Sequence, residues 1–199
     1  MNNGNVNHGR RRFLVGATSV IGAAGAVGVA VPFLSSWQPS AKAEAAGAPR
    51  RLNITKIEKG ERVTLEWRGQ PVWVLRRTQE MLDRLDGIAD RLEDPESNEL
   101  QQPEYVSGTY RSVKPEFLVV VGICTHLGCS PSYRPKPGSE GLGNDWPGGF
   151  FCACHGSKFD LAGRVYTGVP APTNLVVPPH RFEDDGETIA VGVDPEDAA

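Results

Sequence analysis

The hydrophobic and polar positions divide the chain into two parts of different character. From residue 13 to residue 34 it carries no charged side chain and consists mostly of Ala, Val, Gly and Leu. A helix of this length is about 33 Å long, which is enough to cross the hydrocarbon core of a bilayer. Beyond residue 60, short apolar runs alternate with polar residues, which is typical of β-strands. The pattern predicts a transmembrane anchor over 13–35 and a mainly β domain over 50–199.

Within this domain, the segments 61–67 and 72–75 alternate on either side of a Gly-containing turn and predict a hairpin. The run 117–121 is wholly apolar and predicts a buried strand. Between them the period changes to that of a helix over 78–92, with Thr78 as N-cap and Met81, Leu82, Leu85, Ile88, Ala89 and Leu92 on one face. Residues 131–149 are rich in Pro and Gly and predict a surface loop. Further short strands are expected at 150–151, 164–166, 175–177, 181–183 and 188–191, with a turn at Asp185-Gly186 between the last two.

Two interpretations compete for the apolar N-terminal stretch. The sequence Ala41-Lys42-Ala43 matches a signal-peptidase site, which would make the stretch a cleaved signal. Its 22 residues exceed the usual 7–15 of a signal peptide and fit a retained anchor better. Residues 10–12 are all arginine, so the positive-inside rule leaves residues 1–12 as a cytoplasmic tail. Everything after residue 34 is then expected outside the cytoplasm.

The N-terminal arginines also resemble a known export signal. The run Arg11-Arg12-Phe13-Leu14 is similar to a twin-arginine signal, whose pathway exports folded proteins. Nothing before the apolar stretch is typical of a mitochondrial transit peptide, so a bacterial inner membrane, with the domain on the periplasmic side, is the predicted location. Residues 36–49 are small and include two prolines, which predicts a flexible tether in which a short Ala-rich helix remains open. Trp37 suits the membrane interface.

The charge of the exported part argues against one class of function. From residue 44 onward there are 17 Lys and Arg residues against 24 Asp and Glu residues, a balance of −7. Binding to nucleic acid needs a basic face, so nucleic acid is not expected as a partner. An acidic surface would suit a basic electron-transfer partner, although it is more often simply solvated.

All four cysteines fall in two short runs that also contain two of the four histidines. These are Cys124-Thr125-His126-Leu127-Gly128-Cys129 and Cys152-Ala153-Cys154-His155-Gly156-Ser157, called here the first and second box. Two thiolates and two imidazoles suit a tetrahedral zinc site, and they suit equally an iron–sulfur cluster with one iron on sulfur and one on nitrogen. One further cysteine in each box is left over. A zinc site would not need this pair, so the count favours the cluster.

The two boxes resemble those of the Rieske iron–sulfur proteins, and more narrowly the Rieske subunit of quinol–cytochrome c oxidoreductases. The resemblance extends to the N-terminal anchor and to residues 168–172. It implies a Rieske-type antiparallel β-sandwich with an inserted cluster-binding subdomain, about 123–180, and one [2Fe–2S] cluster. Carried over by position, Cys124 and Cys152 would hold one iron, and His126 and His155 the other. Cys129 and Cys154 would form a disulfide, and Ser157 would donate its hydroxyl to a cluster sulfur.

This resemblance also implies a function. One electron from quinol would pass through the cluster to a c-type cytochrome, with a b-type cytochrome taking the other. His155 would be the catalytic residue that accepts a proton from quinol. The partners would be cytochrome b and a c-type cytochrome in a dimeric complex, together with quinol and membrane lipid, and this chain alone would not turn over. The Rieske small subunit of an arsenite oxidase is the alternative, and a membrane-tethered structural zinc module is the alternative from a different class.

Two positions at the site depart from the family pattern, and two histidines lie outside the boxes. Ala153 stands where the family usually has Pro, and Phe159 where many high-potential members have a Tyr that bonds a ligand sulfur. A lower potential than in Tyr-bearing relatives is therefore expected. His8, in a polar tail, and His180, after two prolines, are interpreted as surface or packing residues.

Overall fold

The computed structural model describes residues 7–106 and 108–195, so part of the predicted cytoplasmic tail, residues 1–6, lies outside the described residues. The chain forms two compact units, with the boundary between residues 45 and 46. The first contains helix α1, His8–Ser35, which is long and apolar enough to cross a membrane. Asn7 caps it by accepting a hydrogen bond from the backbone N–H of Arg10 at 3.0 Å.

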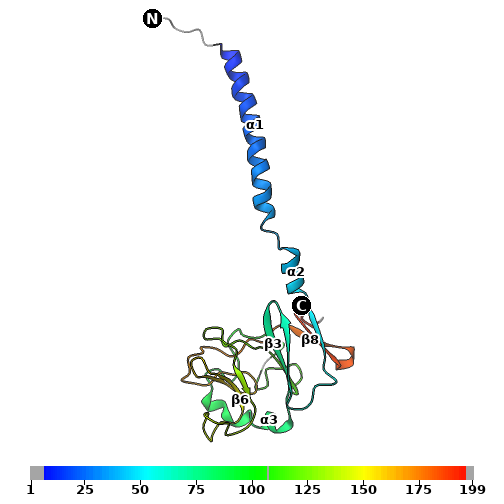
Figure 1. The fold of residues 1–199 in the computed structure, drawn as a ribbon, viewed down its shortest axis with the longest axis vertical. Coiled ribbons are helices and arrows are strands. Elements are labelled where there is room, and N and C mark those ends of the chain that lie inside the picture. The colour runs from blue at the N-terminus through cyan, green and yellow to red at the C-terminus, as the bar shows by residue number, and fades with distance from the viewer. Residues whose placement is uncertain (1–6, 107, 196–199) are drawn as a thin grey trace. The chain divides into compact units, whose positions relative to one another are not determined.

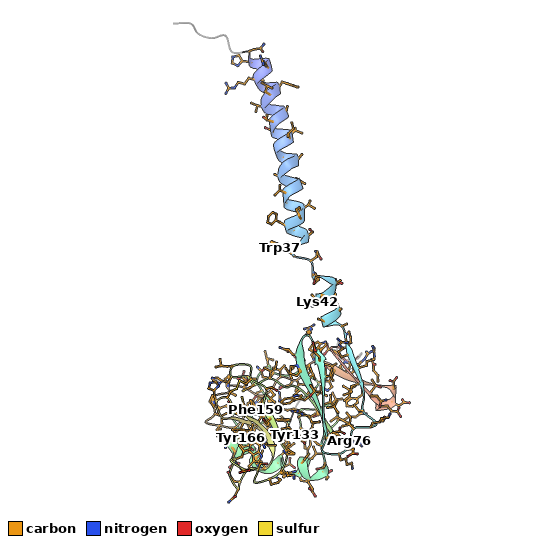
Figure 2. The ribbon with its side chains drawn as sticks, viewed as in Figure 1. Trp37, Lys42, Arg76, Tyr133, Phe159 and Tyr166 are labelled. Carbon is orange, nitrogen blue, oxygen red and sulfur yellow. A yellow bond between two sulfur atoms is a disulfide. The ribbon has the colours of Figure 1, made fainter. Side chains whose placement is uncertain are left out.

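The segment predicted as a tether contains a short helix. Helix α2 spans Ala41–Gly47, and the Ser40 hydroxyl accepts a hydrogen bond from the Ala43 N–H at 3.2 Å. Trp37, which lies between α1 and α2, exposes 82% of its surface (Figure 2).

The second unit is built from three antiparallel sheets of three strands each (Figure 1). The first sheet, in the order β1-β9-β8, joins the two ends of the unit, and the second, β2-β3-β4, is a meander whose last strand is buried. The third, β5-β6-β7, carries the second box. The strands are β1 Arg50–Asn53, β2 Arg62–Trp67, β3 Gln70–Arg76, β4 Phe117–Val121, β5 Ser132–Arg134, β6 Gly149–Cys152, β7 Ser157–Phe159, β8 His180–Glu183 and β9 Thr188–Val191.

Six predicted strands are confirmed, as β2, β3, β4, β6, β8 and β9; the bounds of β4 and β9 are those predicted, and the other four differ by one to three residues. The predictions at 164–166 and 175–177 are wrong. Val165 and Tyr166 form only isolated bridges, to Phe159 and Leu92. The backbone groups of 175–177 bond to three separate segments. The Leu175 N–H donates to the Gly163 carbonyl and the Val177 N–H to the Gln101 carbonyl, while the Val176 carbonyl accepts the Val121 N–H. An apolar run can be buried in this way without forming a ladder.

Three strands were not predicted, because they are short and lack alternation. β1 and β7 are mainly polar, and β5 lies inside the segment 131–149 that was expected to be a loop.

The turn at Asp185-Gly186 also differs, because Glu183 pairs with Thr188 and leaves four residues between the strands. The 3₁₀ turn η2, Asp184–Gly186, fills this connection, with positive φ at all three residues.

The single helix expected over 78–92 is two shorter pieces. Thr78 caps α3, Gln79–Asp83, as predicted, through its side chain and the Met81 N–H. The 3₁₀ helix η1 follows, Asp86–Arg91. A 3₁₀ helix has three residues per turn, fewer than an α-helix, so side chains in η1 point in other directions than the α-helical pattern predicts. Ala89 is therefore exposed, although that pattern placed it on the buried face. The other five apolar positions of the predicted face are buried: Met81, Leu82, Leu85, Ile88 and Leu92.

Two hydrophobic cores lie on opposite faces of the sheet β2-β3-β4. Val72 and Val74 pack into one core with the β1-β9-β8 sheet, while Trp73 and Leu75 pack into the other. The alternation of β3 explains this division, because successive side chains of a strand point to opposite faces. The Trp73 core also contains Phe150 of β6, which stacks on Trp73 with ring centroids 5.1 Å apart. This second core supports the two boxes.

His180 is a packing residue, as expected, but it is fully buried at the start of β8. Its Nδ1 bonds to the Pro178 carbonyl at 2.9 Å, its Nε2 has no partner, and burial lowers its pKa. The nearby Tyr105 bonds to the His180 backbone and to Asp194. His8, in contrast, is exposed at the start of α1.

Buried His180 is expected to make the domain less stable in acid. Because its pKa is lower in the folded state, the unfolded chain binds more protons as pH falls below about 6.5. The contribution of His180 is thus complete above that pH and decreases below it, by at most about 1.4 kcal/mol per pH unit. Denaturant unfolding between pH 7.5 and 5 should give a steeper decrease for the wild type than for His180→Gln, and equal slopes would contradict the prediction.

Candidate metal centre

The first box follows strand β4 directly and closes into a tight turn. The Cys124 carbonyl accepts a hydrogen bond from the Gly128 N–H at 3.1 Å, and the Cys124 N–H donates to the Cys129 carbonyl at 2.7 Å. Gly128 has a φ of +83°, a left-handed conformation that favours glycine. The turn leaves Cys124 buried and places His126 and Leu127 on its outer side, with Leu127 71% exposed.

The second box is the turn of the β6–β7 hairpin. Cys152 ends β6 and pairs in register with Ser157, which begins β7. The Gly156 N–H donates to the Cys152 carbonyl at 2.9 Å, and Gly156 has the same φ of +83° as Gly128. The two boxes thus make the same five-residue turn, with a buried cysteine first and a glycine last. Within this shared frame, the histidine is third in the first box and fourth in the second.

A third loop, residues 168–173, ties the two boxes together. Thr125 of the first box donates its hydroxyl to the Thr173 carbonyl at 2.7 Å. Ser157 of the second box accepts a hydrogen bond from the Ala171 N–H at 3.0 Å through its own hydroxyl oxygen. Two prolines, at 170 and 172, restrict the backbone between these contacts. Ser157 and the segment that contains these prolines were identified from the sequence as parts of the site, whereas Thr125 was not.

The six cysteine and histidine residues of the boxes form three pairs. Cys129 and Cys154 are joined in a disulfide, as expected. Cys124 and Cys152 are free, buried and close enough for their thiols to interact. The rings of His126 and His155 lie edge to face with centroids 4.7 Å apart. The fold therefore pairs thiol with thiol and imidazole with imidazole.

This pairing distinguishes between a single metal ion and a two-iron cluster. The four donors of a tetrahedral zinc ion lie about 3.3–3.8 Å from one another. Among the described residues, only the sulfurs of Cys129, Cys152 and Cys154 form a group of three donors within 4.8 Å, and two of these are consumed by the disulfide. Within the described residues, no imidazole nitrogen therefore completes a group of three donors with the Cys124 and Cys152 thiols. A thiol pair beside an imidazole pair fits a cluster with one iron on two sulfurs and the other on two nitrogens.

The surroundings of the thiols are apolar on one side and polar on the other. Burial raises the pKa of the Cys124 thiol, while hydrogen bonds from the backbone N–H of His126 and from the Ser157 hydroxyl act to lower it. On the inner side, Phe159 is fully buried in the same core as both free cysteines. On the outer side, His155 and Ala153 are exposed and His126 is half-buried. The site is therefore closed from below and open above the histidines.

Comparison with known proteins agrees with this geometry. The family described as "Rieske [2Fe-2S] domain" matches residues 51–179, and the one described as "Ubiquitinol-cytochrome C reductase Fe-S subunit TAT signal" matches residues 1–40. The chain is 56% identical over 189 residues to the ubiquinol-cytochrome c reductase iron-sulfur subunit of Allochromatium vinosum, covering 95% of this chain and 91% of the relative. The chain belongs to this family of Rieske iron–sulfur subunits. Its cofactor is one [2Fe–2S] cluster.

The relationship extends beyond one group of bacteria. The corresponding subunit of Blastochloris viridis is 42% identical, over 88% of this chain and 89% of that protein. The mitochondrial Rieske subunit of the cytochrome b-c1 complex of Schizosaccharomyces pombe is 36% identical, over 90% of this chain and 69% of that protein. The apolar α1 and the N-terminal signal match fit a single-pass anchor.

Four buried charged residues of the domain were not identified from the sequence. Asp160, which directly follows β7, forms a buried ion pair with Arg164 at 2.7 Å. Arg77, after β3, and Arg111, in the 104–116 segment, are also buried. The i,i+4 spacing of Asp160 and Arg164 is a signal that could have been noticed, whereas nothing in the sequence near Arg77 or Arg111 indicates burial.

Proposed function

We propose that this chain accepts one electron from quinol and passes it to a c-type cytochrome, while a b-type cytochrome takes the second electron. The observation that carries this proposal is the pairing of the two free thiols with each other and of the two imidazoles with each other. It is supported by relatives that are named ubiquinol-cytochrome c reductase subunits. The cluster supplies a one-electron couple of higher potential than all-cysteine clusters have, because neutral imidazoles replace two thiolates.

We assign each residue of the boxes a role in holding that cluster. Cys124 and Cys152 bind one iron as thiolates, and their burial keeps water away from the sulfur side. His126 and His155 bind the other iron. Ser157, which is fully buried beside the Cys124 thiol, donates its hydroxyl to a sulfur and stabilises negative charge there. The Cys129–Cys154 disulfide holds the two turns at a fixed separation.

His155 is proposed as the residue that meets quinol. Quinol oxidation releases protons together with electrons, so the acceptor site needs a basic group that solvent and quinol can reach. The His155 side chain is exposed, whereas that of His126 is half-buried. The exposed Leu127, on the neighbouring turn, offers an apolar surface for docking on cytochrome b. His155 thus accepts the quinol proton, and His126 acts mainly as a ligand.

The assembly follows from the domain plan proposed for the chain. Residues 1–12 form a cytoplasmic tail with a twin-arginine signal, 13–35 the anchor, 36–49 the neck and 50–199 the cluster domain. We place this domain on the periplasmic side of a bacterial inner membrane, within a dimeric complex of cytochrome b and a c-type cytochrome. The exposed apolar side chains of α1 contact lipid or partner helices.

Rapid mixing of membranes that contain the intact complex tests this function. Ubiquinol should reduce both the iron–sulfur cluster and cytochrome b in the same turnover, and arsenite should reduce neither. The small subunit of an arsenite oxidase would respond in the opposite way, so reduction by arsenite alone would refute the proposal. A structural zinc module would give no iron–sulfur signal with either reductant.

Phe159 is expected to set a lower midpoint potential than a tyrosine would at this position. Its ring is fully buried in the core that contains both free cysteines, and in the resembled family a tyrosine hydroxyl at this position bonds a ligand sulfur. A hydrogen bond about 1 kcal/mol stronger in the reduced state raises a one-electron midpoint by about 40 mV. Redox titration should show this rise, whereas an unchanged or lower midpoint would contradict it. Phe151→Tyr, on the opposite face of β6, is the control and should leave the potential unchanged.

A further inference from the structure

Four charged side chains form a fully buried cluster beneath the second box. Arg77, Arg111 and Arg164 are each at most 1% exposed, and Asp160 is 0% exposed. Three positive charges therefore share one buried negative charge. Such a group is unusual, because a charge that is removed from water is ordinarily paired.

One arginine and the aspartate neutralise each other. Arg164 Nε donates to one Asp160 oxygen at 2.7 Å, and the other oxygen accepts the backbone N–H groups of Ala162 and Arg164, both at 2.8 Å. The remaining guanidinium nitrogens of Arg164 donate to the carbonyls of Pro95 and Leu85. This pair thus adds little net charge to the interior.

The other two arginines are bound only by uncharged groups. Arg77 donates to the Pro115 and Leu161 carbonyls and to the Ser112 hydroxyl. The acceptors of Arg111 are the carbonyls of Ala162, Gly163 and Leu175 and the side-chain oxygen of Gln102. Within the described residues, neither arginine forms a salt bridge. The carboxylates of Asp160 and of half-buried Asp94 act to raise the pKa of Arg111 without a hydrogen bond to it. Burial lowers the pKa of Arg77 to about 9 and that of Arg111 to about 10, so both remain charged near pH 7.

These two charges lie close to the boxes. Leu161 and Ala162, whose carbonyls they bind, belong to the same hydrophobic core as Cys124 and Cys152. Arg111 also binds the Leu175 carbonyl, and two residues before it the Thr173 carbonyl accepts the hydroxyl of Thr125, next to Cys124. The low-dielectric core between the arginines and the cysteines screens their charge less than water would.

We propose that Arg77 and Arg111 raise the midpoint potential of the cluster through their charge, and that Asp160 opposes them. This inference rests on the proposed ligand set, because the cluster must lie between the boxes. Reduction adds one negative charge to the cluster, and a buried positive charge favours that state. At an effective dielectric of 20, a unit charge that lies about 10–15 Å from a redox group changes its reduced-to-oxidised ratio by about tenfold.

Redox titration of the holoprotein, followed by its iron–sulfur signal, tests this proposal. Arg111→Gln should lower the reduced-to-oxidised ratio about tenfold at the wild-type midpoint, a shift of about 59 mV for one electron. Arg111→Lys keeps the charge and should stay near the wild type. Asp160→Asn retains an oxygen acceptor for the two N–H groups, and should raise the ratio. Opposite shifts at Arg111 and Asp160 follow from charge, whereas simple loosening of the same buried segment would move both in one direction.

A surface arginine provides the matched control. Arg91 is 35% exposed and is paired with the exposed Asp145, so Arg91→Gln should shift the ratio much less. If Arg111→Gln does not fold, Arg77→Gln and Asp160→Asn test the proposal in the same way: the first should lower the reduced-to-oxidised ratio and the second should raise it. Shifts in the same direction, shifts no larger than that of Arg91→Gln, or an equal effect of Arg111→Lys and Arg111→Gln would overturn the proposal. A wild-type chain without any iron–sulfur signal would instead refute the ligand set.

Discussion

Cys152→Ser is expected to remove nearly all iron from the purified protein. Cys152 is one of the two free, buried cysteines; it ends β6, opposite Ser157, and its thiol interacts with that of Cys124. A serine hydroxyl is a far poorer ligand for iron than a thiolate, and the apolar surroundings of the site would not stabilise its ionised form. The remaining three donors include only one sulfur. Iron per chain should therefore fall from about two towards zero, measured by iron analysis after expression under identical conditions.

The control for this experiment removes more sulfur from the same loops. The double variant Cys129→Ser/Cys154→Ser loses two cysteines but neither proposed ligand, and it should still contain iron when freshly purified. If Cys152→Ser kept its iron while the double variant lost it, the assignment of ligand and bridge would be reversed. Cys124→Ser should behave as Cys152→Ser does, because the two thiols form the sulfur pair.

The double variant is itself expected to be much less stable. The disulfide joins residues 25 positions apart, and the chain-entropy treatment gives such a loop about 3.5 kcal/mol. For a domain whose total stability is about 5–15 kcal/mol, this is a large share. The loss should also loosen the two turns over the cluster, because the disulfide is the one covalent side-chain cross-link between the boxes among the described residues.

Denaturant unfolding of the wild type and the double variant, both with cluster, measures this difference. The free energy of unfolding should fall by about 3.5 kcal/mol, and cluster loss in air should become faster. A difference below about 0.5 kcal/mol would show that backbone contacts alone hold the turns together. The hydrogen bonds of the third loop, from Thr125 to Thr173 and from Ala171 to Ser157, are the contacts that could do so.

The sequence predicted the chemistry of this protein better than its architecture. The resemblance carried by the two boxes was sufficient to propose the ligands, because a cysteine, a histidine and a glycine in each box can be recognised without knowing the fold. The strands with clear alternation or continuous apolar character, such as β2 and β4, were also predictable.

The failures have a common physical cause. The segment 175–177 is apolar because it is buried, but its backbone bonds connect it to three different segments rather than to one strand. β7 is short and polar on its outer side, so local pattern cannot identify it. Arg77 and Arg111 look like surface residues in the sequence, and only long-range contacts with the 161–163 carbonyls make them part of the interior. Tertiary contacts, rather than local preferences, determine each of these positions.

Mössbauer spectroscopy of the reduced holoprotein, enriched in ⁵⁷Fe, tests most directly whether the four donors are divided between two irons. Cys124 with Cys152, and His126 with His155, should give two iron sites of equal population but distinct isomer shift, one ferric on sulfur and one ferrous on nitrogen. A single kind of iron site, or protein that contains zinc and no iron, would contradict the division of donors on which the proposed electron transfer depends.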